Sequence, residues 1–74
     1  MDGIVIDEKV RFGKPVVKGT RVSVDEVLGA LAGGMTYEEI EKEYGVTKEG
    51  VKAALQYATE VISEEQVGAV KVKA

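Results

Sequence analysis

The chain has 74 residues, with 13 acidic and 10 basic side chains and neither cysteine nor histidine. This length suffices for one small domain, and the missing residue types exclude disulfides, thiolate metal sites and the commonest general base. No apolar run approaches the roughly 20 residues of a membrane-spanning helix. We therefore expect a soluble, cytoplasmic protein that is not an enzyme and uses no cofactor, metal or membrane.

The net charge of -3 is unevenly distributed along the chain. Residues 1–22 carry five basic and three acidic side chains, whereas residues 23–74 carry five lysines and ten acids. Binding to nucleic acid depends largely on phosphate neutralisation, so the acidic balance argues mildly against it. Any phosphate contact is expected to rely on the N-terminal part.

Residues 3–22 are predicted to form a β arm. The runs "GIVI", "VRF" and "VVK" are short and β-branched, and the last two flank Gly13-Lys14-Pro15, which predicts a hairpin connection. Pro15 has no N–H to donate, so it is expected to begin the second strand or to lie at an edge. A hairpin this short needs a helical layer or another strand to cover it.

Three helices are predicted over about residues 23–63, followed by a C-terminal tail over 64–74. Residues 23–26 and 36–39 fit capping boxes, and Thr47 offers an N-cap for the third helix. Gly33-Gly34 is expected to end the first helix, and Gly45 to end the second in a left-handed conformation. Residues 1–63 would then form a single domain.

Helical spacing predicts the side chains that face the core. In the second helix the inward stripe would be Tyr37, Ile40 and Tyr44. In the third it would include Val51, Ala54, Leu55, Ala58 and Ile62. We expect five residues of the three helices to be buried together: Leu28, Leu31, Ile40, Val51 and Leu55.

The segment from residue 37 to 58 has the pattern of a helix-turn-helix. Ile40 would be buried, Gly45 would allow the sharp turn, and Val46 would fill the core before the second helix packs through Val51. Glu41 disagrees, because close helix packing favours a small residue there. A purely structural three-helix bundle gives the same pattern. If the motif reads DNA, the outward donors of the third helix are Thr47, Lys48, Lys52 and Gln56.

The stretch "FGKPVVKGTRVSV", residues 12–24, has two interpretations. Gly13 and Gly19 suit positive φ, and the chain then leads to a helix N-terminus, where Lys14, Lys18 and Arg21 would grip a phosphate. Alternatively, the glycines only make turns and the cations are solvated or paired with acids. We expect Thr20 to satisfy backbone donors and Arg21 to bridge the arm to an acid of the helical part. Lys14 and Lys18, at the hairpin tip, would be free for phosphate or an acidic partner.

The order of residues in "GKPVVKGTRVSVDEVLGALAGGMTYEEI" resembles the domain-of-unknown-function family four-three-three, a group of short VapB-like antitoxin proteins. The resemblance extends from Ile4 to Ala58, and its motif residues are Gly13, Pro15, Gly19, Thr20 and Arg21. It implies a β arm followed by a homeodomain-like or winged-helix-like three-helix domain. It also implies a toxin–antitoxin role with a PIN-like toxin as partner, and it supplies no catalytic residues. Gly45 departs from the family, which often has proline there, and makes the turn more like an ordinary helix-turn-helix.

Two functions follow as hypotheses. The first is a homodimeric antitoxin that binds operator DNA through the helix-turn-helix and uses another surface for a toxin. The second is a protein-interaction module that neutralises a partner without touching DNA, as the acidic second helix suggests. In either case an unpaired strand edge favours pairing across a two-fold axis. The expected dimer interface is Ile4, Val5, Ile6, Val10 and Phe12.

Overall fold

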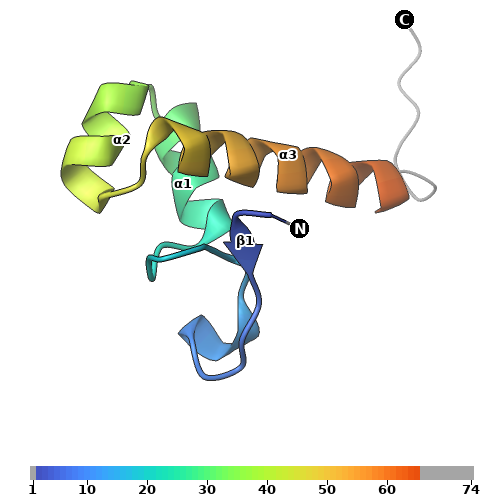
Figure 1. Ribbon diagram of the computed structural model, residues 1–74. Helices are drawn as coiled ribbons and strands as arrows, with labels where there is room; N and C mark the ends of the chain where they lie inside the picture. The colour runs from blue at the N-terminus through green and yellow to red at the C-terminus, as the bar shows by residue number, and fades with distance from the viewer. Residues whose placement is uncertain (1, 66–74) are drawn as a thin grey trace, which may run out of the picture.

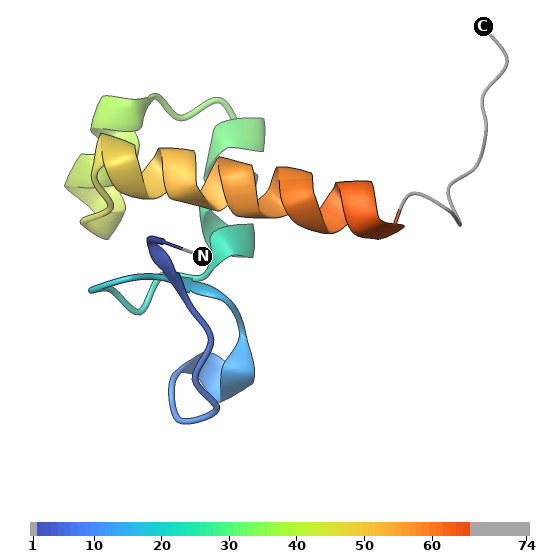
Figure 2. The same cartoon turned by 45° about the vertical axis from the view of Figure 1, so that its right-hand side comes forward.

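The computed structural model describes residues 2–65, which form three helices and a short two-stranded arm (Figure 1). In chain order the elements are β1 (Ile4–Val5), the 3-10 turn η1 (Arg11–Gly13), β2 (Val16–Val17), α1 (Val24–Ala32), α2 (Tyr37–Tyr44) and α3 (Lys48–Glu65). α3 contacts both other helices and both strands, so it lies at the centre of the packing (Figure 2). The expected mainly helical fold with an N-terminal β arm is confirmed. The tail from residue 66 onward lies outside the described residues.

The predicted helix starts and the predicted ends of α1 and α2 are confirmed, because they depend on local capping, whereas α3 continues to Glu65, past its predicted end at about residue 63. Ser23 and Thr36 each form a complete capping box with the glutamate three residues later. α1 ends at Gly33-Gly34, where the N–H groups of Gly34 and Met35 donate to the carbonyls of Leu31 and Ala30, both at 3.0 Å. This is the Schellman arrangement, and Gly34 supplies the positive φ of 96° that it requires.

The expected pairing of "VRF" with "VVK" is wrong. β2 pairs instead with β1, antiparallel, with Ile4 opposite Val17 and Val5 opposite Val16. Residues 11–13 form a left-handed turn, with φ of 51° at Arg11, 59° at Phe12 and 83° at Gly13. Gly13-Lys14-Pro15 is therefore not a hairpin connection, because it leads from this turn into β2.

The second edge of β2 is covered by the chain that returns toward α1. The N–H of Val17 donates to the Val22 carbonyl, and the N–H of Val24 donates to the Pro15 carbonyl, each at 2.9 Å. Pro15 thus lies beside β2 and serves as an acceptor, which needs no N–H. These bonds deliver the chain directly to the N-terminus of α1.

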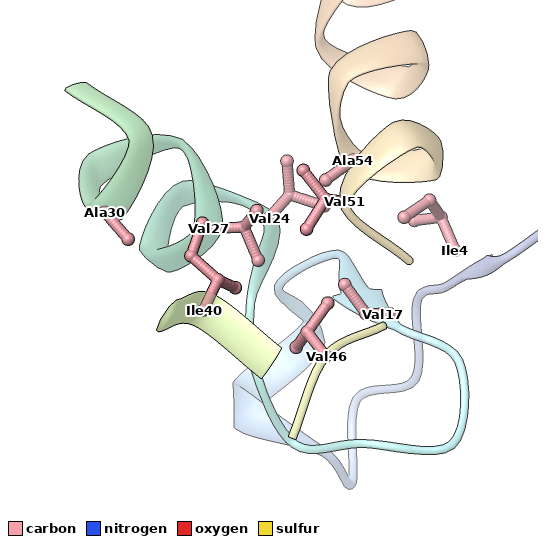
Figure 3. Close-up of a cluster of buried hydrophobic side chains, with 9 residues drawn as sticks. All are labelled: Ile4, Val17, Val24, Val27, Ala30, Ile40, Val46, Val51 and Ala54. Carbon is pink, nitrogen blue, oxygen red and sulfur yellow. The ribbon is translucent and has the colours of Figure 1, made fainter. Parts of the chain in front are cut away.

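A cluster of small and branched side chains from both strands, all three helices and the turn between α2 and α3 forms the core (Figure 3). Ile40 and Val51 are fully buried, as expected, whereas Leu28 and Leu31 are only partly buried. Leu55 is 37% exposed, so its predicted burial is wrong. Its neighbour Ala54 takes the inward position. The cluster consists of Ile4, Val17, Val24, Val27, Ala30, Ile40, Val46, Val51 and Ala54.

Two further side chains of the predicted inward stripes are also exposed. Tyr44 at the end of α2 is 40% exposed, and Ile62 near the end of α3 is 67% exposed. The C-terminal end of α3 extends beyond β1 and α2 (Figure 1). Helical spacing alone therefore overestimated how much of α3 is covered.

Ile40→Ala and Leu55→Ala separate the observed core from the predicted one. Ile40→Ala should cost about 2–5 kcal/mol, because it leaves a cavity at a fully buried site. Leu55→Ala should cost only about 1 kcal/mol, because the side chain already contacts water. Urea unfolding followed by circular dichroism measures both, and equal losses would contradict the observed rotation of α3.

Candidate nucleic-acid interface

The turn between α2 and α3 has the geometry expected of a helix-turn-helix. Gly45 ends α2 with φ of 74°, and its N–H donates to the Glu41 carbonyl at 2.9 Å. Val46 is fully buried, and Thr47 caps α3 by accepting from the N–H of Gly50 at 3.2 Å. Three residues thus end one helix, anchor the turn in the core and begin the next helix.

The outward side of α3 carries a row of polar side chains. Lys48, Lys52 and Gln56 are exposed and lie at i, i+4 and i+8, which places them on one face. We call these three residues the α3 polar row. The Lys48 ammonium lies 5.9 Å from the centre of the Tyr37 ring, so the start of the row is also in contact with α2.

The surface of α2 is acidic. Glu38, Glu39, Glu41 and Glu43 are all exposed, and Glu39 also closes the capping box with Thr36. These carboxylates would repel a phosphate backbone, and Glu49 at the start of α3 would do the same. A nucleic acid would therefore have to approach α3 from the side of the polar row.

A cleft of about 400 Å³ brings the arm next to the N-terminus of α3. Lys18 and Thr20 line it from the loop after β2, while Thr47 lines it from the turn before α3 and Glu49 from α3 itself. Two of the predicted DNA-binding residues, Lys18 and Thr47, are thus brought together from distant parts of the sequence.

Lys14 lies apart from Lys18, so their predicted shared position at a hairpin tip is wrong. The Lys14 ammonium is 3.3 Å from the Asp25 carboxylate, and Lys14 borders a different groove, between α1 and α3. The reason is that Lys14 and Pro15 come after the turn at residues 11–13 and lie beside the start of α1, where the Val24 N–H donates to the Pro15 carbonyl. The structure does not bring Lys14 to the α3 polar row.

The loop at Gly19-Thr20-Arg21 is a tight turn that Thr20 closes. The Thr20 hydroxyl donates to the Val17 carbonyl at 2.8 Å and accepts from the N–H of Val22 at 3.0 Å, and Gly19 has φ of 82°. The expected ion pair of Arg21 is wrong. In residues 2–64 the ion pairs are Arg11–Glu26 and Lys14–Asp25.

Arg11, which the sequence analysis did not single out, joins the arm to α1. One of its guanidinium nitrogens lies 2.8 Å from the Glu26 carboxylate and 2.9 Å from the Arg21 carbonyl. Arg21 therefore contributes its backbone to this contact and leaves its side chain exposed. No local pattern signals Arg11, since its partners are 10 and 15 residues away.

Glycine residues that also escaped the sequence analysis set the distance between the arm and α3. A Cβ on Gly50 would lie 2.8 Å from Val46 Cγ1 and 3.0 Å from Val17 Cγ1, and one on Gly3 would lie 2.8 Å from Ala53 Cβ. Such distances are too short for real side chains. A glycine inside a helical pattern costs stability, so Gly50 itself was a signal of close packing.

The N-terminus of α1 holds two carboxylates whose charged forms are stabilised. Hydrogen bonds from the backbone and hydroxyl of Ser23, and then from Arg11, hold the pKa of Glu26 below its ordinary value of 4.5. The Ser23 hydroxyl, and then Lys14, likewise hold the pKa of Asp25 below 3.8. Ser23 is fully buried, so this network fixes the start of α1.

The structure of residues 2–65 offers no group of three or more acidic side chains that could hold a metal ion. Over the same residues, no helix is long and apolar enough to cross a membrane.

The model of the family described as "Protein of unknown function (DUF433)" matches residues 4–58. The chain belongs to this family. The matched segment begins at β1 and ends within α3, so it contains the arm, the Gly-Thr-Arg turn, the helix-turn-helix and the α3 polar row.

Two curated proteins show what this chain is similar to. The protein named "Putative antitoxin VapB45" from Mycobacterium tuberculosis is 38% identical over 52 residues, which make up 70% of this chain and 22% of that protein. An "Uncharacterized protein" from Archaeoglobus fulgidus is 60% identical over 25 residues, 34% of this chain and 69% of that protein. This chain thus spans less than a quarter of the length of the Mycobacterium relative. No solved structure matches it significantly.

Gly50→Ala should destabilise the protein by about 1–3 kcal/mol, because the added methyl overpacks the contact between α3 and the arm. Gly29→Ala is the matched control, since Gly29 lies in α1 with no atom within 4 Å of the added Cβ. That variant should gain about 0.5–1 kcal/mol from helix propensity. Thermal unfolding distinguishes the two, and a stabilised Gly50→Ala variant would contradict the close approach.

The stability of the protein should fall in acid because the carboxyls of Asp25 and Glu26 have lowered pKa values in the folded state. Their ionised forms stabilise the fold above the unfolded pKa, and this contribution is lost as the pH falls through the folded pKa. Glu26→Gln should therefore be less stable than the parent at neutral pH and lose less stability between about pH 5 and pH 3. Urea unfolding at each pH measures this, with Glu43→Gln on the exposed side of α2 as the charge-matched control. Parallel pH profiles for Glu26→Gln and the parent would contradict the role of Glu26.

Proposed function

We propose that this protein is an antitoxin-like regulator that binds operator DNA through α3 and pairs with a PIN-like toxin in the cytoplasm. The name of the Mycobacterium relative supports the antitoxin role, and the aligned 52 residues cover most of this chain. The toxin partner follows from the resemblance of the Gly-x-Pro and Gly-Thr-Arg motifs to VapB-like antitoxins. The relative is several times longer, so only the role of the shared segment is carried over.

The α3 polar row is the observation that carries the DNA-binding proposal. From Lys48 to Gln56 the row extends eight residues, about 12 Å at 1.5 Å per residue. The major groove of B-DNA is about 12 Å wide and admits one helix, because a helix with its side chains is about 10–12 Å across. Lysine can contact phosphates or guanine, and glutamine can make paired hydrogen bonds to adenine. The row therefore supplies both positioning and base-reading groups.

Lys18 supports the same orientation from the arm. It borders the cleft at the N-terminus of α3, where Thr47 also lies. A duplex that meets the polar row would pass this loop, so Lys18 and Thr47 would add backbone contacts beside the helix. Lys14 borders the other groove and is not assigned to DNA.

The alternative function is a protein-interaction module that neutralises a partner without binding DNA. The four exposed glutamates of α2 and the net charge of -3 favour it, because they suit a basic protein surface better than a phosphate backbone. The two functions differ in whether the polar row contacts nucleic acid, which salt dependence can test.

Lys48→Ala with Lys52→Ala should weaken binding to the DNA upstream of the protein's own gene and reduce its salt dependence. Each lost phosphate contact lowers the slope of log affinity against log salt by about 0.9, so the double variant should lose up to about 1.8. Fluorescence anisotropy at several salt concentrations measures the slope. Lys42→Ala on α2 is the control and should leave it unchanged.

A second pair of variants tests the orientation. Lys18→Ala should lower the slope by about 0.9, whereas Lys14→Ala should not change it. If the parent does not bind this DNA but binds a PIN-like toxin, the interaction-module alternative is correct. If the Lys48 and Lys52 double variant has the same slope of log affinity against log salt as the parent, α3 is not part of the DNA interface.

A further inference from the structure

An apolar groove runs between α1 and the C-terminal half of α3. Its volume is about 390 Å³, and its walls include Pro15 before β2, Leu28 on α1 and Tyr57, Val61 and Ile62 on α3. We call this the α1–α3 groove. Its wall residue Ile62 is 67% exposed, so a large aliphatic side chain faces water there.

Phe12 is the most exposed large apolar side chain of the described residues. It is 98% exposed and has φ of 59°, a left-handed conformation that is costly for a bulky residue. The hydrogen bonds of Arg11 to Glu26 and to the Arg21 carbonyl hold the turn in place. η1 lies at the end of the arm far from α3, so Phe12 is carried on a projection (Figures 1 and 2). Strained backbone that presents an aromatic side chain to water is typical of a contact site.

We propose that Phe12 of one copy inserts into the α1–α3 groove of a second copy, and that the two copies form a two-fold symmetric dimer. The anchor and its receptor are neighbours on one chain, because Lys14 and Pro15 border the groove and Phe12 lies two residues before Lys14. A two-fold axis close to residues 12–15 therefore places each Phe12 near the groove of the other copy. Both contacts form at once, as an isologous interface requires.

The charges at the rim of the groove are compatible with this arrangement. Lys14 and Asp25 border the groove and carry opposite charges at a separation of 3.3 Å. Each Lys14 is already paired with Asp25 of its own copy, so this part of the rim is electrically neutral toward the partner. The two phenylalanines would bury roughly 300–500 Å² as the apolar centre of the interface.

Phe12 also belongs to the dimer interface predicted from the sequence. In the present proposal it contacts the α1–α3 groove of the partner and not a strand edge. Pairing of strand edges stays a prediction, but β1 has two residues and the Ile4 side chain is buried in its own core. A two-residue edge provides few hydrogen bonds to a partner strand. The groove uses residues of α3 outside the polar row, so dimerisation does not rest on DNA binding.

Sedimentation equilibrium of the full chain tests the proposal with single variants. Phe12→Ala removes the anchor, and Ile62→Glu places a charge in the groove at an exposed position, where folding is little affected. Each variant should weaken self-association at least about tenfold, because it disrupts the contact between Phe12 and the groove in both copies. Ile6→Ala, a change of a 60% exposed residue in the same arm, is the control and should leave association unchanged. Circular dichroism confirms that each variant is folded.

Mixing the two variants provides the sharper test. In a mixed pair, the intact groove of Phe12→Ala receives Phe12 from Ile62→Glu, while the blocked groove faces no phenylalanine. One of the two contacts is restored, so fluorescence energy transfer should report a mixed dimer about tenfold tighter than either variant alone. A mixture no tighter than the separate variants overturns the proposal. The proposal is also overturned if the parent protein stays monomeric at about 0.5 mM. It is overturned as well if Ile6→Ala weakens self-association while Phe12→Ala and Ile62→Glu do not.

Discussion

The close approach of α3 to the β arm determines which side of α3 faces solvent. Gly50 and Gly3 lack the Cβ atoms that would clash with Val46, Val17 and Ala53. Because these contacts are so short, α3 cannot rotate about its axis without losing them. This orientation of α3 about its axis buries Val51 and Ala54, and it leaves Lys48, Lys52 and Gln56 exposed on the outer side. A packing constraint made by glycines therefore creates the surface that we propose for DNA.

Polar contacts hold the arm against α1 in a complementary way. Ser23 begins α1 from a fully buried position, and Glu26 closes the cap and also accepts from Arg11. Since Arg11 belongs to the left-handed turn, one ion pair both fixes the arm and orients Phe12 outward. The turn that this contact holds therefore combines a left-handed backbone with the exposed side chain of Phe12.

Much of the fold could be predicted because helix ends depend on residues close together in sequence. The caps at Ser23 and Thr36 and the turn at Gly45 need only the next few residues, and the structure has them as expected. The strands and ion pairs were harder, because Arg11 and Glu26 are 15 residues apart. Leu55 and Ala54 are adjacent and both fit a helical stripe. The packing of α3 against the arm, α1 and α2 decides which of them turns inward.

The proposed site was partly predictable for the same reason. The outward spacing of Lys48, Lys52 and Gln56 follows from the helix alone, whereas the separation of Lys14 from Lys18 follows from the path of the arm.

The most direct test of DNA recognition by α3 is a nuclear magnetic resonance titration of the isotopically labelled protein with the DNA upstream of its own gene. We expect the amide signals of residues 47–56 and of Lys18 to shift, while those of the acidic side of α2 stay in place. Shifts confined to α2 or to the α1–α3 groove, or no shifts at low salt, would contradict DNA recognition by α3.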